Sequence, residues 1–142
     1  MSVTHFRELT VWRAAMDLAK TAYRLTASFP SEQRYGLAAQ LQRSAVSVPS
    51  NIAEGNGRSS TRDYARFVSM ALGSVAELQT QLLLADELSM GEETRRHEAL
   101  ALCDRVGQML SKLHRALICK LDNESRIPSR ESRSTNPGLR RR

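Results

Sequence analysis

A proline inside an amphipathic helical pattern constrains the fold of this chain more than any other feature. Pro49 cannot donate a hydrogen bond to the carbonyl of Ala45, and its ring crowds that carbonyl. The sequence therefore predicts a kink or a helix end near Val48, one further turn, and a stop at Gly55. The surrounding apolar residues recur every three or four positions, which is the spacing of one buried helical face: Leu37, Leu41, Ala45, Val48 and Ile52.

Periodicity and end signals predict three more helices. The first ends at Phe29-Pro30, because the residue before a proline is pushed out of helical geometry. Ser60 and Asp63 have the spacing of a capping box, which starts the third helix, and Gly91 separates it from the fourth. Four long amphipathic helices with short connections predict an all-α protein, an antiparallel up-down four-helix bundle with a kinked second helix. The expected helices span about residues 10–28, 35–55, 60–88 and 92–121.

The composition changes at Asp122. From there to the end the chain carries six arginines against three acidic residues, together with two prolines, and no helical face can be drawn through it. Such a segment is typical of disorder. We therefore expect a bundle domain over residues 1–121 and a disordered basic tail over residues 122–142. The arginines of this tail are Arg126, Arg130, Arg133, Arg140, Arg141 and Arg142.

Several short segments, in this order, also resemble a known family. They are Tyr35-Gly36-Leu37, Gln40-Leu41 with Arg43, the string SVPSNIAEG over residues 47–55, and Gly73-Ser74 with Glu77-Leu78. The chain resembles the small four-helix-bundle proteins found in intervening sequences of bacterial large-subunit rRNA genes. The accessory variability proteins of diversity-generating retroelements belong to the same family. The resemblance runs from about Phe6 to Leu121, and implies a basic helical protein that assembles as a five-fold barrel, contacts nucleic acid and has no catalytic motif.

The charge balance points to a nucleic-acid partner. There are 21 Lys and Arg residues against 15 Asp and Glu residues, which gives a net charge of +6 and a sequence pI near 10.0. Guanidinium groups pair with phosphates and stack on bases, so this surplus favours nucleic acid. The few aromatic residues lie mostly on expected core faces, which argues against a stacking platform for single strands. We expect contacts to the phosphates of structured RNA or of an RNA–DNA hybrid, with little sequence preference.

Three groups of basic residues are the candidate phosphate contacts. One group steps by four residues through the start of the third helix, one shares a face of the fourth helix, and one ends the tail. A basic stripe on a helix can also be only its solvated face, and the tail can be only a solubility element. The candidates are Arg58, Arg62, Arg66, Arg105, Lys112, Arg115, Arg140, Arg141 and Arg142.

The proline-containing block has a structural interpretation of its own. Asn51 and Glu54 are expected to close backbone groups that Pro49 and the following turn leave free. Arg43 and Arg62 could neutralise Glu54, an acid in an apolar block. The residues of this structural motif are Arg43, Pro49, Asn51, Glu54 and Gly55.

The apolar faces are wider than a single subunit needs. Val11, Leu18 and Leu25 form a second stripe on the first helix, at seven-residue spacing. Three successive leucines at 82–84 sweep about 200° of the third helix, so one of them, Leu83, points away from the core. These four residues are the candidate interface of a homo-oligomer, which the resemblance implies is a pentamer. The alternatives are scattered surface leucines, or a scaffold that binds a nucleic-acid enzyme such as a reverse transcriptase.

No arrangement of residues predicts catalysis, a cofactor or a metal site. The sequence has no Glu-x-x-His pair, no CxxC, no glycine-rich phosphate loop and no nucleophile elbow. Glu93 and His97 could share a metal, but an exposed helix-start pair is the favoured interpretation. Cys103 and Cys119 would lie about 24 Å apart on one helix, too far to pair. Because these catalytic motifs are absent, we expect a protein that is not an enzyme. Because the sequence has no signal peptide and no long apolar run, we also expect a cytoplasmic protein with no membrane partner.

Overall fold

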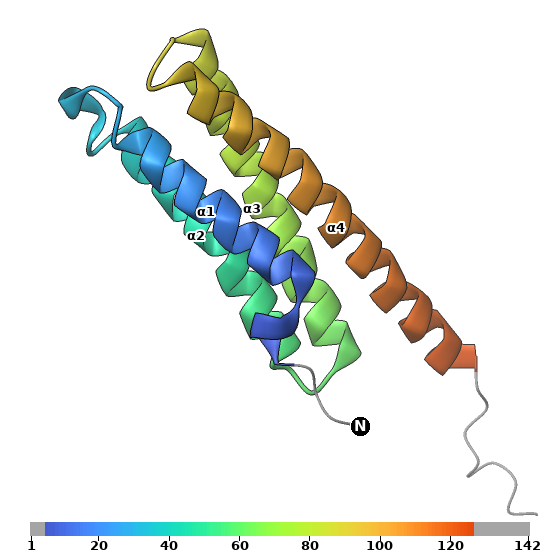
Figure 1. The fold of residues 1–142 in the computed structure, drawn as a ribbon. Helices are drawn as coiled ribbons and strands as arrows, with labels where there is room; N and C mark the ends of the chain where they lie inside the picture. Colours follow the sequence, from blue (N-terminus) through green and yellow to red (C-terminus); the bar gives the residue numbers. More distant parts are fainter. Residues whose placement is uncertain (1–4, 127–142) are drawn as a thin grey trace, which may run out of the picture.

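Four α-helices account for most of residues 5–126, the part of the chain that the computed structural model describes. Short 3-10 turns at Phe6–Glu8 and Ser31–Gln33 precede the first and second helices, and no strand occurs among these residues. Neighbours in the chain run in opposite directions along one long axis (Figure 1). The all-α, antiparallel four-helix prediction is confirmed. The helices are α1 (Thr10–Thr26), α2 (Leu37–Asn56), α3 (Thr61–Glu87) and α4 (Glu93–Arg126).

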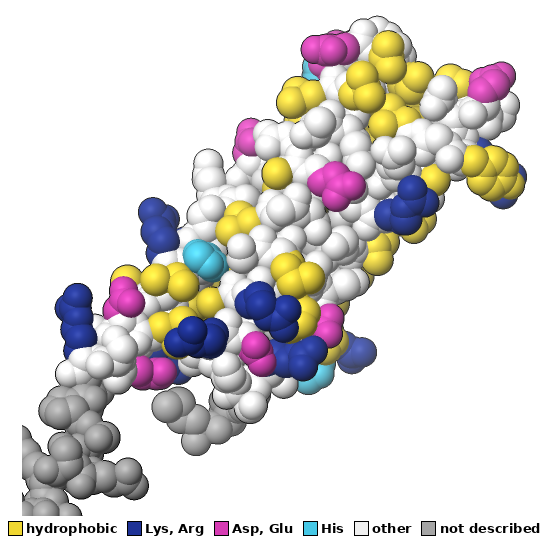
Figure 2. All heavy atoms as spheres, turned by 180° about the vertical axis from the view of Figure 1, so that it is seen from behind, with side chains coloured by type: hydrophobic (Ala, Val, Ile, Leu, Met, Phe, Trp, Pro, Cys, Tyr) yellow, Lys and Arg dark blue, Asp and Glu magenta, His cyan; other side chains and the backbone are white. Residues whose placement is uncertain are grey.

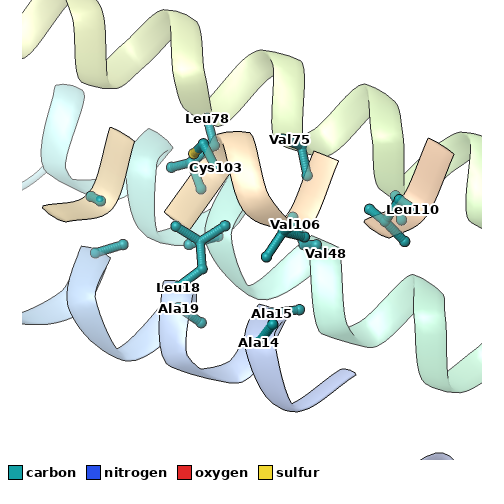
Figure 3. Close-up of a cluster of buried hydrophobic side chains, with 14 of the residues drawn as sticks. Ala14, Ala15, Leu18, Ala19, Val48, Val75, Leu78, Cys103, Val106 and Leu110 are labelled. Carbon is teal, nitrogen blue, oxygen red and sulfur yellow. The ribbon is translucent and has the colours of Figure 1, made fainter. Parts of the chain in front are cut away.

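Each helix packs against two others. α1 contacts α2 and α4, and α3 contacts the same two helices from the opposite side of the bundle. Side chains from all four helices point toward one another in the core (Figure 3). Leu18, Val48, Leu78 and Val106, one from each helix, are completely buried. Burying such side chains supplies the main driving force for folding.

The predicted helix ends have clear local causes. The Ser60 hydroxyl accepts a hydrogen bond from the backbone N–H of Asp63 at 3.1 Å and caps the start of α3. Gly91, between α3 and α4, has a φ of +73°, a left-handed conformation that favours glycine. The turn is tied to the end of α1, because the N–H of Glu92 donates to the Ser28 hydroxyl at 3.0 Å.

α2 continues through Pro49, so of the two predicted alternatives near Val48, a kink or a helix end, the helix end does not occur. The helix runs two further turns and stops at Asn56, one residue after Gly55. Neighbouring side chains supply extra donors to the backbone here. Ser50 Oγ donates to the Val46 carbonyl at 2.8 Å, and Asn51 Nδ2 donates to the Ser47 carbonyl at 2.8 Å. Pro49 itself is buried, so the packing of the bundle holds α2 helical despite the local cost.

The expected second stripe on α1 is wrong. Val11, Leu18 and Leu25 are buried in the core of the bundle, so they are not exposed for an oligomer interface. The reason is that α1 lies between α2 and α4 and therefore buries a wide arc of its surface. Leu83, by contrast, is 49% exposed on α3, beside exposed Leu84.

The expected boundary after Leu121 is also wrong. α4 continues to Arg126, so residues 122–126 are helical rather than the start of a tail. This stretch contains no glycine or proline, and the first helix breaker after it is Pro128. The rest of the predicted tail, residues 127–142, lies outside the described residues. It includes the candidates Arg140, Arg141 and Arg142.

By length and apolar composition alone, α3 could cross a membrane, a test that the core helix of a soluble bundle also passes. In this structure the apolar face of α3 is buried against α2 and α4. The residues of that face include Val68, Ala71, Val75, Leu78 and Leu82.

Candidate nucleic-acid interface

Three candidate arginines lie together at the end of the bundle where α2 turns into α3. Arg58 follows the end of α2, and Arg62 and Arg66 lie on the first turns of α3. The guanidinium carbons of Arg58 and Arg66 each lie 4.8 Å from the centroid of the Phe67 ring. A cation over an aromatic ring is held by the ring's negative face. Buried Phe67 therefore positions two guanidinium groups, and we call Arg58, Arg62 and Arg66 the arginine cluster.

Acidic residues neutralise part of this cluster. Arg58 pairs with Glu54 at 2.9 Å, and Arg66 pairs with Asp63 at a longer 3.7 Å. Among residues 5–126, Arg62 forms no ion pair within 4.0 Å. Exposed pairs of this kind contribute about 0–1 kcal/mol, so a phosphate can replace the carboxylate at little cost.

The same geometry corrects the expected partners of Glu54. Its carboxylate pairs with Arg58, not with Arg43 or Arg62. Arg43 is exposed on α2, where it lines a shallow hollow together with Glu77 of α3. Glu54 is exposed as well, because it lies on the outer side of α2 rather than in an apolar block.

The motif around Pro49 and Gly55 is structural, and it fixes how α2 meets α3. A Cβ at Gly55 would lie 2.6 Å from Phe67 Cβ and 3.1 Å from Tyr64 Cδ2, so only glycine permits this close approach. Ser47 Oγ, which accepts from Asn51 Nδ2 at 3.0 Å, also lies 2.7 Å from Ser74 Oγ of α3. Asn51 bonds the backbone at the Ser47 carbonyl and not at the Ala45 carbonyl that Pro49 leaves without its donor, so the expected closing role is not what the structure shows. These contacts place Phe67, and with it the arginine cluster.

The basic residues of α4 are exposed but do not form one group with the cluster. Arg115 lines a hollow between α3 and α4, whereas Arg105 lies ten residues earlier, about 15 Å along the helix. Lys112 is exposed between them. Lys and Arg side chains gather toward the lower half of the face in Figure 2, interspersed with hydrophobic and acidic side chains. The six described candidates therefore form a compact group at one end and a looser row along α4.

Sequence reasoning missed His114 and Arg96. His114 lines a hollow of about 570 Å³ together with Arg62 and Arg66, which only the pairing of α3 with α4 reveals. Arg96 is buried, and its side chain bonds Asp86 and the Met90 and Gly91 carbonyls. A buried arginine with three hydrogen bonds, one of them to a carboxylate, stabilises the α3–α4 turn. No local sequence motif indicates the role of Arg96, because its acidic partner is ten residues away.

The described residues contain no cluster of three or more His, Cys, Asp or Glu side chains that could hold a metal ion. His97 Nε2 lies 3.6 Å from Asp86 Oδ1, so its near neighbour is this carboxylate. Cys103 is buried and Cys119 is exposed, and both are free thiols. Burial and, secondarily, the charge of Asp104 raise the pKa of Cys103 to about 12, which keeps this thiol protonated and unreactive at neutral pH.

Comparison with known proteins agrees with this architecture. A crystal structure of a protein of unknown function from the S23 ribosomal protein family of Bacteroides thetaiotaomicron superposes with a TM-score of 0.67 at 17% identity. The match covers 74% of this chain and 98% of the other, and it shows the fold. None of the curated proteins matches this chain. The family model of 23S rRNA-intervening sequence proteins matches residues 7–112, and the chain therefore belongs to that family.

Proposed function

We propose that this protein is a non-catalytic, oligomeric nucleic-acid-binding protein that contacts the phosphates of structured RNA or of an RNA–DNA hybrid. The observation that carries the proposal is the arginine cluster. Arg58 and Arg66 lie at equal distances from the Phe67 ring, and Arg62 lies between them in the sequence without an ion pair in the described part of the chain. Exposed guanidinium groups held in place lose less side-chain entropy when they bind a phosphate.

Oligomerisation would multiply the effect of a modest charge surplus. Five copies at +6 each carry +30, and a closed ring would present five arginine clusters together. Exposed Leu83 and Leu84 near the end of α3, and exposed Leu88 directly after it, support an apolar contact between subunits. The pentamer itself is proposed from the resemblance to the family.

The test of nucleic-acid binding is a salt titration with a structured RNA and the full chain. The logarithm of the affinity should fall steeply with the logarithm of the salt concentration, because each phosphate that the protein neutralises releases counterions. Replacing Arg58, Arg62 and Arg66 together by Gln should reduce the slope by about 2–3, because each neutralised phosphate adds about 0.9 to it. The matched control replaces Lys20, Arg24 and Arg34 by Gln, because these exposed residues lie outside the cluster and change the net charge equally.

Affinity that stays flat across the salt series would contradict the proposal. An equal reduction of the slope in both triple variants would instead assign binding to net charge alone. Light scattering on the same samples counts the subunits. Leu83→Glu should lower that count, whereas Ala101→Glu, at an exposed site on α4, should leave it unchanged.

A further inference from the structure

An open groove runs along the seam between α3 and α4. It consists of a hollow of about 570 Å³ between the start of α3 and the end of α4, and a second hollow of about 410 Å³ nearer the middle. Ala65 lines the first and Leu72, seven residues later, lines the second; Ser111 and Ile118 repeat this relationship on α4. Seven residues are about two helical turns, so the two hollows share one face of each helix. We call them together the α3–α4 groove.

Gly107 lines the second hollow, and Gly73 directly follows Leu72, which also lines it. A Cβ at Gly73 would meet no heavy atom within 4 Å, and a Cβ at Gly107 would meet only Val75 Cγ1, at an ordinary 3.8 Å. Neither glycine has a positive φ. Glycine inside a helix costs about 1 kcal/mol relative to alanine. Within residues 5–126 nothing offsets that cost, so the glycines suit the close approach of something outside the subunit.

Apolar and polar side chains line the groove in similar numbers, and one end of it is basic. Met70 on α3 is 46% exposed and Ile118 on α4 is 39% exposed, so both walls offer apolar surface to a partner. The end beside the start of α3 carries Arg62, Arg66 and His114, against one carboxylate, Asp122. A partly apolar channel with a basic end is complementary to an apolar ligand that carries negative charge.

We propose that the α3–α4 groove is the docking site for an amphipathic helix of a partner protein whose apolar face is flanked by acidic side chains. An amphipathic helix can lay its apolar face in a groove of this kind, and glycines let the two backbones approach closely. The acidic side chains of the partner would lie at Arg62 and Arg66. This inference goes beyond the proposed nucleic-acid binding.

Two other occupants fit the groove less well. A phosphate backbone would make no favourable contact with the exposed apolar side chains of Met70 and Ile118, and Asp104 and Asp122 would repel it. Among residues 5–126, the exposed leucines lie near the other end of α3, at 83, 84 and 88. In a ring of copies with parallel axes, those leucines would not reach the larger hollow of a neighbour.

The experiment measures the binding of fluorescent synthetic helical peptides to the full-length protein by anisotropy. The probe has leucines on one face and glutamates beside that face, and the matched control peptide has lysine in place of every glutamate. The glutamate peptide should bind and the lysine peptide should not. Gly107→Leu, which fills the groove, should weaken binding at least about tenfold. Ala101→Leu adds the same side chain at an exposed site on α4 and should leave the affinity unchanged.

Leucine has a higher helix propensity than glycine, so Gly107→Leu should fold, as circular dichroism can verify. Met70→Glu, at an exposed position, is the second variant and should also weaken binding of the glutamate peptide. Equal binding of the two peptides, no binding of either, or an unchanged affinity in both groove variants would overturn the inference.

Two further readouts separate this inference from the proposed function. If Gly107→Leu lowers the subunit count in light scattering, the groove holds a second copy and the inference fails. If the same variant weakens RNA binding with no change of charge, the groove holds nucleic acid and the inference fails as well. The salt dependence of RNA binding tests the proposed function alone, whatever the peptides do.

Discussion

Buried Arg96 of α4 and half-buried Asp86 of α3 form an ion pair, with Arg96 Nε 2.9 Å from Asp86 Oδ1. The arginine side chain is 7% exposed, and the same guanidinium group donates to the Met90 carbonyl at 2.9 Å and to the Gly91 carbonyl. One side chain thus joins the end of α3, the turn and the start of α4. Arg96 makes three of the polar contacts that hold the α3–α4 turn.

Arg96→Met should therefore destabilise the protein. The substitution keeps much of the side-chain length but leaves two part-buried carbonyls and a half-buried carboxylate without their donor, which costs about 2–4 kcal/mol. Urea unfolding followed by circular dichroism measures the change. Arg95→Met is the matched control, because the Arg95–Glu92 pair is on the surface and should contribute less than about 1 kcal/mol. Equal effects of the two substitutions would contradict a structural role for Arg96.

Alanine should have opposite effects at two helical glycines. Gly55→Ala places a Cβ 2.6 Å from Phe67 Cβ, so α2 and α3 must move apart, at a cost of about 1–3 kcal/mol. Gly73→Ala meets nothing and gains helix propensity, so it should stabilise the protein by about 1 kcal/mol. Thermal or urea unfolding of both variants measures the sign of the change in the free energy of unfolding for each. A stabilised Gly55→Ala variant would show that the helices do not approach as closely as the structure indicates.

The two cysteines should differ strongly in reactivity. Cys119 is exposed on α4, whereas Cys103 is buried between the helices and its pKa is raised to about 12. At neutral pH the folded protein should react with one equivalent of a thiol reagent quickly, and with a second only after denaturant is added. The Cys119→Ser variant should lose the fast phase and keep the slow one. A fast phase that persists in that variant would mean that Cys103 is accessible.

Stability should fall in alkaline solution. The ordinary pKa of a cysteine is about 8.5, whereas burial and then Asp104 raise that of Cys103 to about 12 in the folded state. Between these values the unfolded chain has lost the proton and the folded protein keeps it, so the free energy of unfolding decreases as the pH rises. The slope from this one group is at most about 1.4 kcal/mol for each pH unit.

Urea unfolding at a series of pH values from 8 to 11 measures that slope, and Cys103→Ala should make it shallower. Burial also raises the pKa of Tyr64, which adds to the loss of stability above about pH 10 and should remain in the Cys103→Ala variant. An identical slope in the variant and the parent would contradict the shifted pKa of Cys103.

The sequence by itself determined the local elements. Apolar spacing of three and four residues predicted four helices, and the structure confirms them. Ser60 and Gly91 predicted the start of α3 and the break after it, because capping and backbone handedness depend on the nearest neighbours in the chain. The arginine cluster was also visible, since Arg58, Arg62 and Arg66 follow one another at four-residue steps.

Only the tertiary structure decided which surfaces are buried and which residues become partners. Leu18 and Leu25 belong to the core because α1 has two neighbouring helices, and periodicity in one helix does not reveal how many neighbours it has. α2 remains helical through Pro49 because packing against the rest of the bundle outweighs a local cost. The hollow shared by Arg62 and His114 exists because residues 52 positions apart meet when α3 and α4 pair. Contacts between residues so far apart in the sequence form only when the helices pack together, so local sequence patterns do not predict them.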